Sequence, residues 1–226
     1  MIFETNKNSA SRKLYELLKE EIIQLRLKPG SNISENEISE KYNVSRTPVR
    51  EAFLRLSQEG LLTIYPQKGT FVSLIDLSLV EEARFLRETL EKAVVNLACK
   101  EFSQEKVFAL EMNLKYQEMY IKNHDSEKQF QADEQFHKLI FEGCDKTRIW
   151  KIIDEMNNDF KRIRLLRLAT NFNWDDIYIQ HSNIFNGIIH KNPELAEKAM
   201  KEHLTAVNFD KTELVKKYPE YFKEVE

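Results

Sequence analysis

An acid and a histidine stand four positions apart in the stretch FQADEQFH, residues 130–137. On a helix this spacing places Asp133 and His137 on one face, one turn apart. Phe130 and Phe136 beside them have the character of core residues, so the pair is expected on a face near the core. Three kinds of site fit the pattern: a metal site, an acid/base pair, or a buried structural hydrogen bond. The pair alone does not distinguish them.

Two further histidines, His181 and His203, fall in two later predicted helices. Helical bundles build metal sites from inward-facing residues on neighbouring helices. Together with Asp133 and His137 they would supply three imidazoles and one carboxylate, which suit a borderline divalent ion such as Zn, Ni, Co or Mn. A histidine on an apolar face is more often a satisfied core residue, so the residues alone leave both interpretations open.

The composition is that of an ordinary globular protein of 226 residues, with 42% hydrophobic and 31% charged residues. Five Gly and five Pro favour long helices over a turn-rich β architecture. Cys99 and Cys144 form no CxxC pair, which excludes a thiolate zinc knuckle and predicts buried free thiols in a reducing compartment. No apolar run approaches the length of a membrane span and no signal-peptide pattern opens the chain, so we expect a cytoplasmic protein without a membrane partner.

The first seventy-five residues read as three helices followed by a β-hairpin. Apolar spacing predicts helices over residues 11–27 and 34–43, and a third over VSRTPVREAFLRLSQEGLL. In the third helix Pro48 sits in the first turn and Gly60 lies just past the end. The runs LLTIY and TFVSL around PQKG predict the hairpin. This is the element order of a winged helix-turn-helix, and the region carries a mild excess of basic over acidic residues.

The third helix exposes side chains that suit DNA. Arg46 and Arg50 stand four apart at its N-terminal end, with Ser45 and Thr47 beside them. Arginine can pair bidentately with guanine, while hydroxyls and helix N–H groups suit phosphate. Lys68 at the hairpin tip could reach an adjacent groove. These residues could also be solvated surface charges, but they sit where the motif needs them, so the sequence favours DNA binding.

The segment VSRTPVREAFLRLSQEGLL, followed by PQKGTFVS, resembles the GntR family of bacterial transcription regulators over most of residues 10–74. The resemblance implies that the recognition helix and the wing contact operator DNA. Glu51 matches the family's acid after the second arginine and is expected to orient Arg50. By position, the expected DNA-binding residues are Ser45, Arg46, Thr47, Arg50, Lys68, Gly69 and Thr70.

The remainder of the chain predicts an antiparallel all-α bundle of about six helices, with domains over residues 1–75 and 76–226. The first of these helices, roughly 78–101, is expected to turn six residues inward: Phe85, Leu86, Leu90, Val94, Leu97 and Ala98. A basic cluster in the fourth helix is interpreted mostly as a solvated face, with one member able to turn towards a cavity: Lys161, Arg162, Arg164 and Arg167.

The segment ARFLRETLEKAVVNLACK resembles the first helix of the FCD effector domain in FadR-like GntR regulators, and the helix count is similar to the shorter VanR-like form. DEQFH followed by two histidines resembles that domain's metal pattern, which implies four ligands: Asp133, His137, His181 and His203. Arg87 matches the family's arginine on the first helix, which implies a bidentate pair with an effector carboxylate. An ion pair with Glu91, four residues on, is the structural alternative.

We therefore expect a homodimeric transcription regulator, with repression as the commoner mode, that binds double-stranded operator DNA and responds to a small organic acid at a metal site. Two alternatives stay open. One is a metal-dependent hydrolytic enzyme fused to a DNA-binding domain, although the chain has no HExxH motif and no second acid placed as a general base. The other is a purely structural metal. The tail ELVKKYPEYFKEVE has no predicted role.

Overall fold

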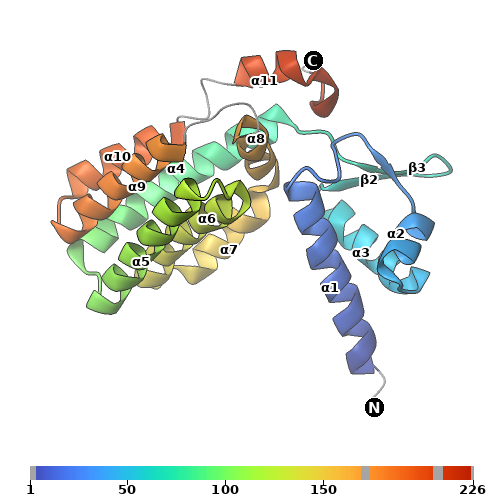
Figure 1. Ribbon diagram of the computed structural model, residues 1–226, viewed down its shortest axis with the longest axis horizontal. Coiled ribbons are helices and arrows are strands. Elements are labelled where there is room, and N and C mark those ends of the chain that lie inside the picture. The colour runs from blue at the N-terminus through green and yellow to red at the C-terminus, as the bar shows by residue number, and fades with distance from the viewer. Residues whose placement is uncertain (1–3, 169–173, 206–210, 225–226) are drawn as a thin grey trace. The chain divides into compact units, whose positions relative to one another are not determined.

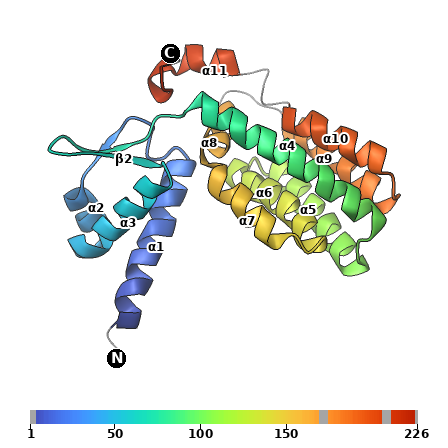
Figure 2. The same cartoon turned by 180° about the vertical axis from the view of Figure 1, so that it is seen from behind.

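A computed structural model describes residues 4–168, 174–205 and 211–224. Contacts divide the chain into two units, Met1–Leu77 together with Glu213–Glu226, and Ser78–Thr212. The sequence had placed the C-terminal residues with the helical domain, whereas the contacts group them with the first unit. The fold is mainly helical, as expected (Figures 1 and 2). Among the described residues, no helix is both long enough and apolar enough to cross a membrane.

The first unit confirms the three helices and the hairpin. Its elements are α1 (Glu4–Ile23), β1 (Asn32–Ile33), α2 (Glu35–Tyr42), α3 (Arg46–Gln58), β2 (Leu62–Tyr65) and β3 (Gly69–Val72). The strand β1, too short to predict from sequence, adds a third strand, so the antiparallel sheet has the order β1-β3-β2. Phe71 stands opposite Asn32 on one side and Thr63 on the other. The turn between β2 and β3 projects beyond the helices as the wing (Figure 1).

Local signals explain where these elements begin and end. Ser34 caps α2 through a full capping box, in which the Glu37 amide donates to the Ser34 hydroxyl and the Ser34 amide donates to the Glu37 carboxylate, both at 3.1 Å. In the wing, Gly69 has a φ of +117°, and a Cβ there would lie 3.1 Å from the Asn32 side chain. On α1, Leu14 and Leu18 are buried, whereas Leu17 between them is 40% exposed.

The second unit contains more helices than expected. Those from Ser78 on that the structure describes are α4 (Leu77–Lys100), α5 (Gln104–Lys122), α6 (Ser126–Gly143), α7 (Thr147–Met156), α8 (Asn158–Leu168), α9 (Trp174–Ile189), α10 (Pro193–Thr205) and α11 (Lys211–Lys217). The predicted fourth helix is in fact two helices, because the chain leaves the helical conformation at Asn157, with φ −97° and ψ 9°. The apolar periodicity continues across this break, so the sequence pattern does not reveal it.

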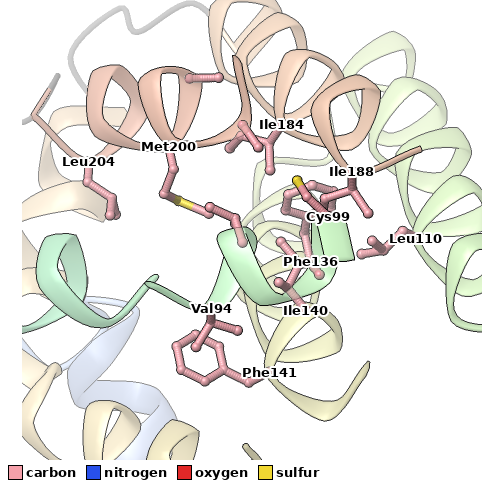
Figure 3. Packing of buried hydrophobic residues seen from close by; sticks show 14 of the residues in the cluster. Val94, Cys99, Leu110, Phe136, Ile140, Phe141, Ile184, Ile188, Met200 and Leu204 are labelled. Carbon is pink, nitrogen blue, oxygen red and sulfur yellow. The ribbon is translucent and has the colours of Figure 1, made fainter. Parts of the chain in front are cut away.

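The core of the helical unit joins α4, α5, α6, α7, α9 and α10 (Figure 3). Val94 and Ala98 are buried as expected, but Phe85 is 68% exposed and Leu97 is 40% exposed. The inward face of α4 instead carries Arg87, among others. A pattern read from hydrophobicity misses such a face because buried charges that pair with each other look like surface residues in the sequence.

A close approach holds α9 against α10. A Cβ on Gly187 of α9 would lie 2.7 Å from both the Cβ and the backbone nitrogen of Ala196 on α10. Only glycine permits this separation. The thiol of Cys99 on α4 donates to the Gly187 carbonyl at 3.5 Å, and that of Cys144 donates to the Val94 carbonyl at 3.6 Å. The packing of α9 on α10 sets the spacing of the two histidines that these helices carry.

Candidate metal centre and nucleic-acid interface

Four buried side chains from three helices meet inside the helical unit. Asp133 and His137 lie one turn apart on α6, His181 lies on α9 and His203 lies on α10. Each offers one ligand atom, and these four atoms all lie within 4.8 Å of one another. The structure thus brings together the four residues that the sequence had singled out from segments up to seventy positions apart.

Each imidazole is held through its Nδ1 atom. His137 Nδ1 contacts the Glu91 carboxylate, His181 Nδ1 lies 2.9 Å from Gln117 Oε1, and His203 Nδ1 lies 3.0 Å from Gln180 Oε1. All three partners are oxygen atoms that accept, so each Nδ1 donates. The Gln117 amide is itself oriented, because its Nε2 donates to Asn113 Oδ1 at 2.7 Å. In a neutral imidazole this leaves the lone pair on Nε2.

The three Nε2 atoms and one carboxylate oxygen face a common point. His137 Nε2 lies 3.1 Å from His203 Nε2, and His181 Nε2 lies 3.6 Å from Asp133 Oδ1. Neither His181 Nε2 nor Asp133 Oδ1 has a hydrogen-bond partner among the described residues. Buried acceptors that face one another repel unless a cation or a proton lies between them. The donor set therefore fits a bound cation.

The electrostatics favour neutral imidazoles at His181 and His203 and an ionised Asp133. Burial lowers the pKa of His181 from its ordinary value of 6.5 to about 3. Burial, followed by the neighbouring histidines, also holds the pKa of His203 well below its ordinary value. Burial alone would raise the pKa of Asp133, but the Arg164 guanidinium and the histidines outweigh it and lower the pKa to about 2. These are the protonation states that a metal ion requires of its ligands.

Arg87 forms an ion pair with Glu91 through only one of its guanidinium nitrogens. Its Nε donates to Glu91 at 2.5 Å, and Glu91 in turn contacts His137. Its Nη1 and Nη2 atoms are buried and have no hydrogen bond among the described residues, although Nη1 lies 3.5 Å from the Glu134 carboxylate. The structural alternative, the pair with Glu91, is therefore present and uses Nε, while Nη1 faces the Glu134 carboxylate; an effector contact by Arg87 stays a prediction.

The basic cluster of α8 is not a solvated face. Arg162 is fully buried and Arg164 is 6% exposed, so this part of the sequence interpretation was wrong. Arg164 bonds to Asp133 and, at 2.6 Å, to Glu134. The error has a physical reason: the charge of Arg164 is compensated by two acids on α6, which no pattern within α8 reports, whereas Arg162 pairs with Asp159 on its own helix.

A small pocket, partly open to solvent, borders the cluster at His203. Polar side chains of Arg164, Arg167 and Gln180 line it. Its apolar lining comes from three other residues: Phe160, Ile177 and Leu204. Arg87 is not part of this lining. A small molecule in the pocket would meet guanidinium groups and a ligand histidine at once.

The recognition helix of the first unit presents its polar side chains outward. Ser45, Arg46, Thr47 and Arg50 are all exposed at the N-terminal end of α3, and Lys68 is exposed at the wing tip. Ser45 occupies the N-cap position without a side-chain cap hydrogen bond, so its hydroxyl is free for an external acceptor. This is the arrangement that a major-groove reader needs.

The acid that orients Arg50 is Glu35 of α2. Arg50 donates from Nε and Nη2 to the two oxygens of Glu35, at 3.0 and 2.9 Å. The expectation that Glu51 would do this was wrong, because the fork of Arg50 reaches across to α2 rather than along α3. Sequence reasoning also missed the supporting residues Gln117 and Gln180. Their partners lie on other helices, so no spacing along the chain could have found them.

Comparison with known proteins decides the family. Residues 10–72 match the model of bacterial regulatory proteins of the gntR family, and residues 82–206 match the FCD domain. This chain belongs to the GntR family and carries an FCD domain. It is 29% identical to the HTH-type transcriptional repressor RspR of Escherichia coli, over 99% of this chain and 100% of that protein. It is 35% identical to an HTH-type transcriptional regulator of Streptomyces ambofaciens, over 97% of this chain and 92% of that protein.

Solved structures share the fold of this GntR regulator. The Escherichia coli protein McbR/YncC superposes with a TM-score of 0.75 at 20% identity, covering 92% of this chain and 98% of that one. A GntR regulator from a Rhodococcus species gives the same TM-score at 22% identity, over the same shares of both chains. The relatives and the fold are those of transcription regulators rather than enzymes, so the hydrolytic alternative falls away.

Proposed function

We propose that this GntR regulator is a repressor whose operator binding responds to a small carboxylate held at a divalent metal ion in the helical unit. The metal ligands would be Asp133, His137, His181 and His203. In the first unit, the operator contacts would come from Ser45, Arg46, Thr47 and Arg50 on α3 and from Lys68, Gly69 and Thr70 on the wing. As a homodimer, two winged units would read the two halves of a pseudo-palindromic site. A relative named as a repressor supports the direction of control.

The observation that carries the proposal is the convergence of lone pairs. Glu91, Gln117 and Gln180 occupy the three Nδ1 atoms, so the three Nε2 lone pairs have no proton of their own. The four ligand atoms lie within 4.8 Å of one another. Ligands on opposite sides of one ion would be separated by about 4 Å, given bonds of roughly 2.0–2.2 Å, so a small adjustment closes the site.

The donor set also bears on which ion fits. Four protein ligands would complete the tetrahedral shell of a structural Zn²⁺. An ion that prefers six ligands, such as Ni²⁺, Co²⁺ or Mn²⁺, would keep positions for the oxygens of an effector carboxylate. When bound, the ion would thus supply a Lewis-acid position for an oxygen anion. A purely structural metal remains the alternative, and the identity of the ion separates the two.

Charge balance supports an anionic effector. Around the imidazoles, three cations pair with four acids: Arg87, Lys161 and Arg164 with Glu91, Asp133, Glu134 and Asp154. A divalent ion would therefore leave an excess of positive charge in a poorly solvated interior. Such an excess is costly unless an anion compensates it. The open fork of Arg87 and the guanidinium groups at the pocket offer the matching contacts.

Elemental analysis of untagged protein purified without chelator tests the metal. We expect roughly one divalent ion per chain, lost in His203→Ala because the site would lose a ligand. His190→Ala is the matched control, since His190 is exposed and its Nδ1 bonds only the carbonyl of Asn186. A parent protein that holds no ion even after reloading with Zn²⁺, Ni²⁺, Co²⁺ and Mn²⁺ would contradict the metal site.

The effector is tested on DNA. Operator duplexes are selected from a random pool with the parent protein, and carboxylic acids are then screened for release of the labelled duplex by fluorescence anisotropy. A true effector should lose its action in His203→Ala while that variant still binds the operator. An acid that releases DNA equally from both proteins acts elsewhere.

A further inference from the structure

The C-terminal segment belongs to the DNA-binding unit, although the chain reaches it only after the whole helical unit. Contacts group Glu213–Glu226 with Met1–Leu77. After α11 the chain forms the short 3-10 helix η2 (Pro219–Tyr221), and Phe222 then becomes extended, with φ −109° and ψ 148°. The chain is therefore connected between its two units twice, once at residues 77–78 and again within α11.

The extended end pairs its backbone with the residues that follow the wing. The amide of Ile75 donates to the Tyr221 carbonyl at 2.8 Å, and the amide of Lys223 donates to the Ile75 carbonyl at 3.0 Å. These two bonds make a parallel bridge between Ile75 and Phe222. Lys223 Nζ also lies 2.9 Å from the carboxylate of Asp76. Addition of an extended segment to free backbone groups is a common mode of peptide recognition.

Side-chain packing holds the segment in addition to the backbone hydrogen bonds. Phe222 is 4% exposed and Ile75 is fully buried, whereas a chain end that is not held is normally exposed. Gly30 lies beside the segment, since a Cβ there would be in ordinary contact with the Glu220 carbonyl at 3.7 Å, and its φ of +78° favours glycine. The rings of Tyr218 and Tyr221 stack with centroids 5.4 Å apart across η2. The segment therefore has a built seat on the first unit.

The same segment starts next to the metal-site helix. His203 lies on α10, and Lys211, the first residue of α11, follows it by eight positions. Lys211 forms an ion pair with Glu81 of α4 within the helical unit. The chain thus leads from the helix that carries His203 to a segment whose far end is seated on the first unit.

We propose that residues 213–224 form a docked strap, whose seat is the edge made by Gly30 and Leu74–Asp76 and whose docking depends on the state of the histidine cluster. The docking stands independently of the proposed function, whereas the nature of the signal rests on it. A ligand at the cluster can act this way only by favouring the docked or the undocked arrangement. The strap then couples that ligand to Ile75, which follows the wing strand β3 along the chain.

Hydrogen exchange of the full chain tests the docking. In Phe222→Ala we expect the peptide that contains Ile75 to exchange at least tenfold faster than in the parent, because the anchor of the bridge is lost. Lys223→Pro removes the amide that donates to Ile75, together with the ion pair to Asp76, and should have the same effect without touching the core. The exposed Glu224→Ala is the control. Parental exchange in both test variants would overturn the docking.

The dependence on the cluster is tested in the same measurement. His203→Ala should change exchange of the Ile75 peptide at least threefold, while His190→Ala leaves it unchanged. If His203→Ala leaves it unchanged as well, the coupling is refuted and the strap is only a clamp. Metal content of the same samples separates the two proposals. If the parent protein contains no metal but exchange of the Ile75 peptide still changes in His203→Ala, the coupling stands and the proposed metal site is refuted.

Discussion

The two candidate sites of this regulator are built in opposite ways. At the N-terminal end of α3 four candidate side chains are exposed within six positions: Ser45, Arg46, Thr47 and Arg50. In the helical unit the functional side chains are buried, come from three helices and depend on neighbours from two more. An exposed site can change without disturbing the fold, whereas a buried charged site is part of the fold. Substitutions should therefore change DNA affinity at the exposed site but destabilise the fold at the buried one.

The largest expected effect on stability follows from Asp133→Ala. This change leaves the buried Arg164 with Glu134 as its remaining acid, and breaking such a pair costs about 3 kcal/mol of unfolding free energy. Denaturant unfolding followed by tryptophan fluorescence measures it. Asp133→Asn, which keeps the shape and can still accept from Arg164, should cost less. A loss below about 1 kcal/mol in Asp133→Ala would show that the buried network is not structural.

For the exposed site, Arg50→Ala should leave the melting temperature unchanged and weaken operator binding. We expect a loss on the order of tenfold to a hundredfold in Kd, as for a base-reading arginine. Fluorescence anisotropy at fixed salt measures it. Arg55→Ala is the matched control, because Arg55 lies on the same helix but its guanidinium stacks 3.7 Å from the Tyr15 ring centroid. Equal losses in both variants would point to general charge rather than to readout.

A third change tests how tightly the buried site depends on helix packing. Gly187→Ala places a methyl group against the backbone of Ala196, which should cost about 1–3 kcal/mol of unfolding free energy by overpacking. It should also weaken metal uptake, because α9 and α10 carry His181 and His203. Gly60→Ala is a comparison in the other unit, where a Cβ would meet nothing within 4 Å and only the positive φ opposes it. Full metal uptake in Gly187→Ala would argue against the dependence on packing.

The smallest expected effect comes from Glu35→Gln. Loss of the acid frees the guanidinium of Arg50 and removes a negative charge near the DNA-facing surface. Non-specific binding should then rise a few-fold while the preference for the operator falls, since the orientation of Arg50 is lost. Competition between operator and random duplex measures the ratio. An unchanged ratio would mean that Glu35 does not position Arg50 for readout.

The comparison also explains what the sequence could predict. The order of three helices and a hairpin, and the exposed face of α3, depend on neighbours within a few positions, so local patterns indicate them. Asp133 and His137 were singled out because they share one turn of helix, and the resemblance to the FCD domain added His181 and His203. What supports them was not found, because the oxygen of Gln180 meets His203 from another helix. The inward turn of Arg164 was missed for the same reason, since its partners Asp133 and Glu134 lie on α6.

Cysteine and tryptophan happen to be confined to the helical half of the sequence. Both cysteines and both tryptophans lie between residues 99 and 174. Burial raises the pKa of both thiols, and Cys99 is only 3% exposed, so little reactive thiolate is accessible at Cys99 while the bundle is closed. The rate of alkylation by a thiol reagent would then measure how often the bundle opens, and the winged unit, which has no cysteine, would not contribute. Thiol accessibility thus reports opening of the helical unit without a contribution from the DNA-binding unit.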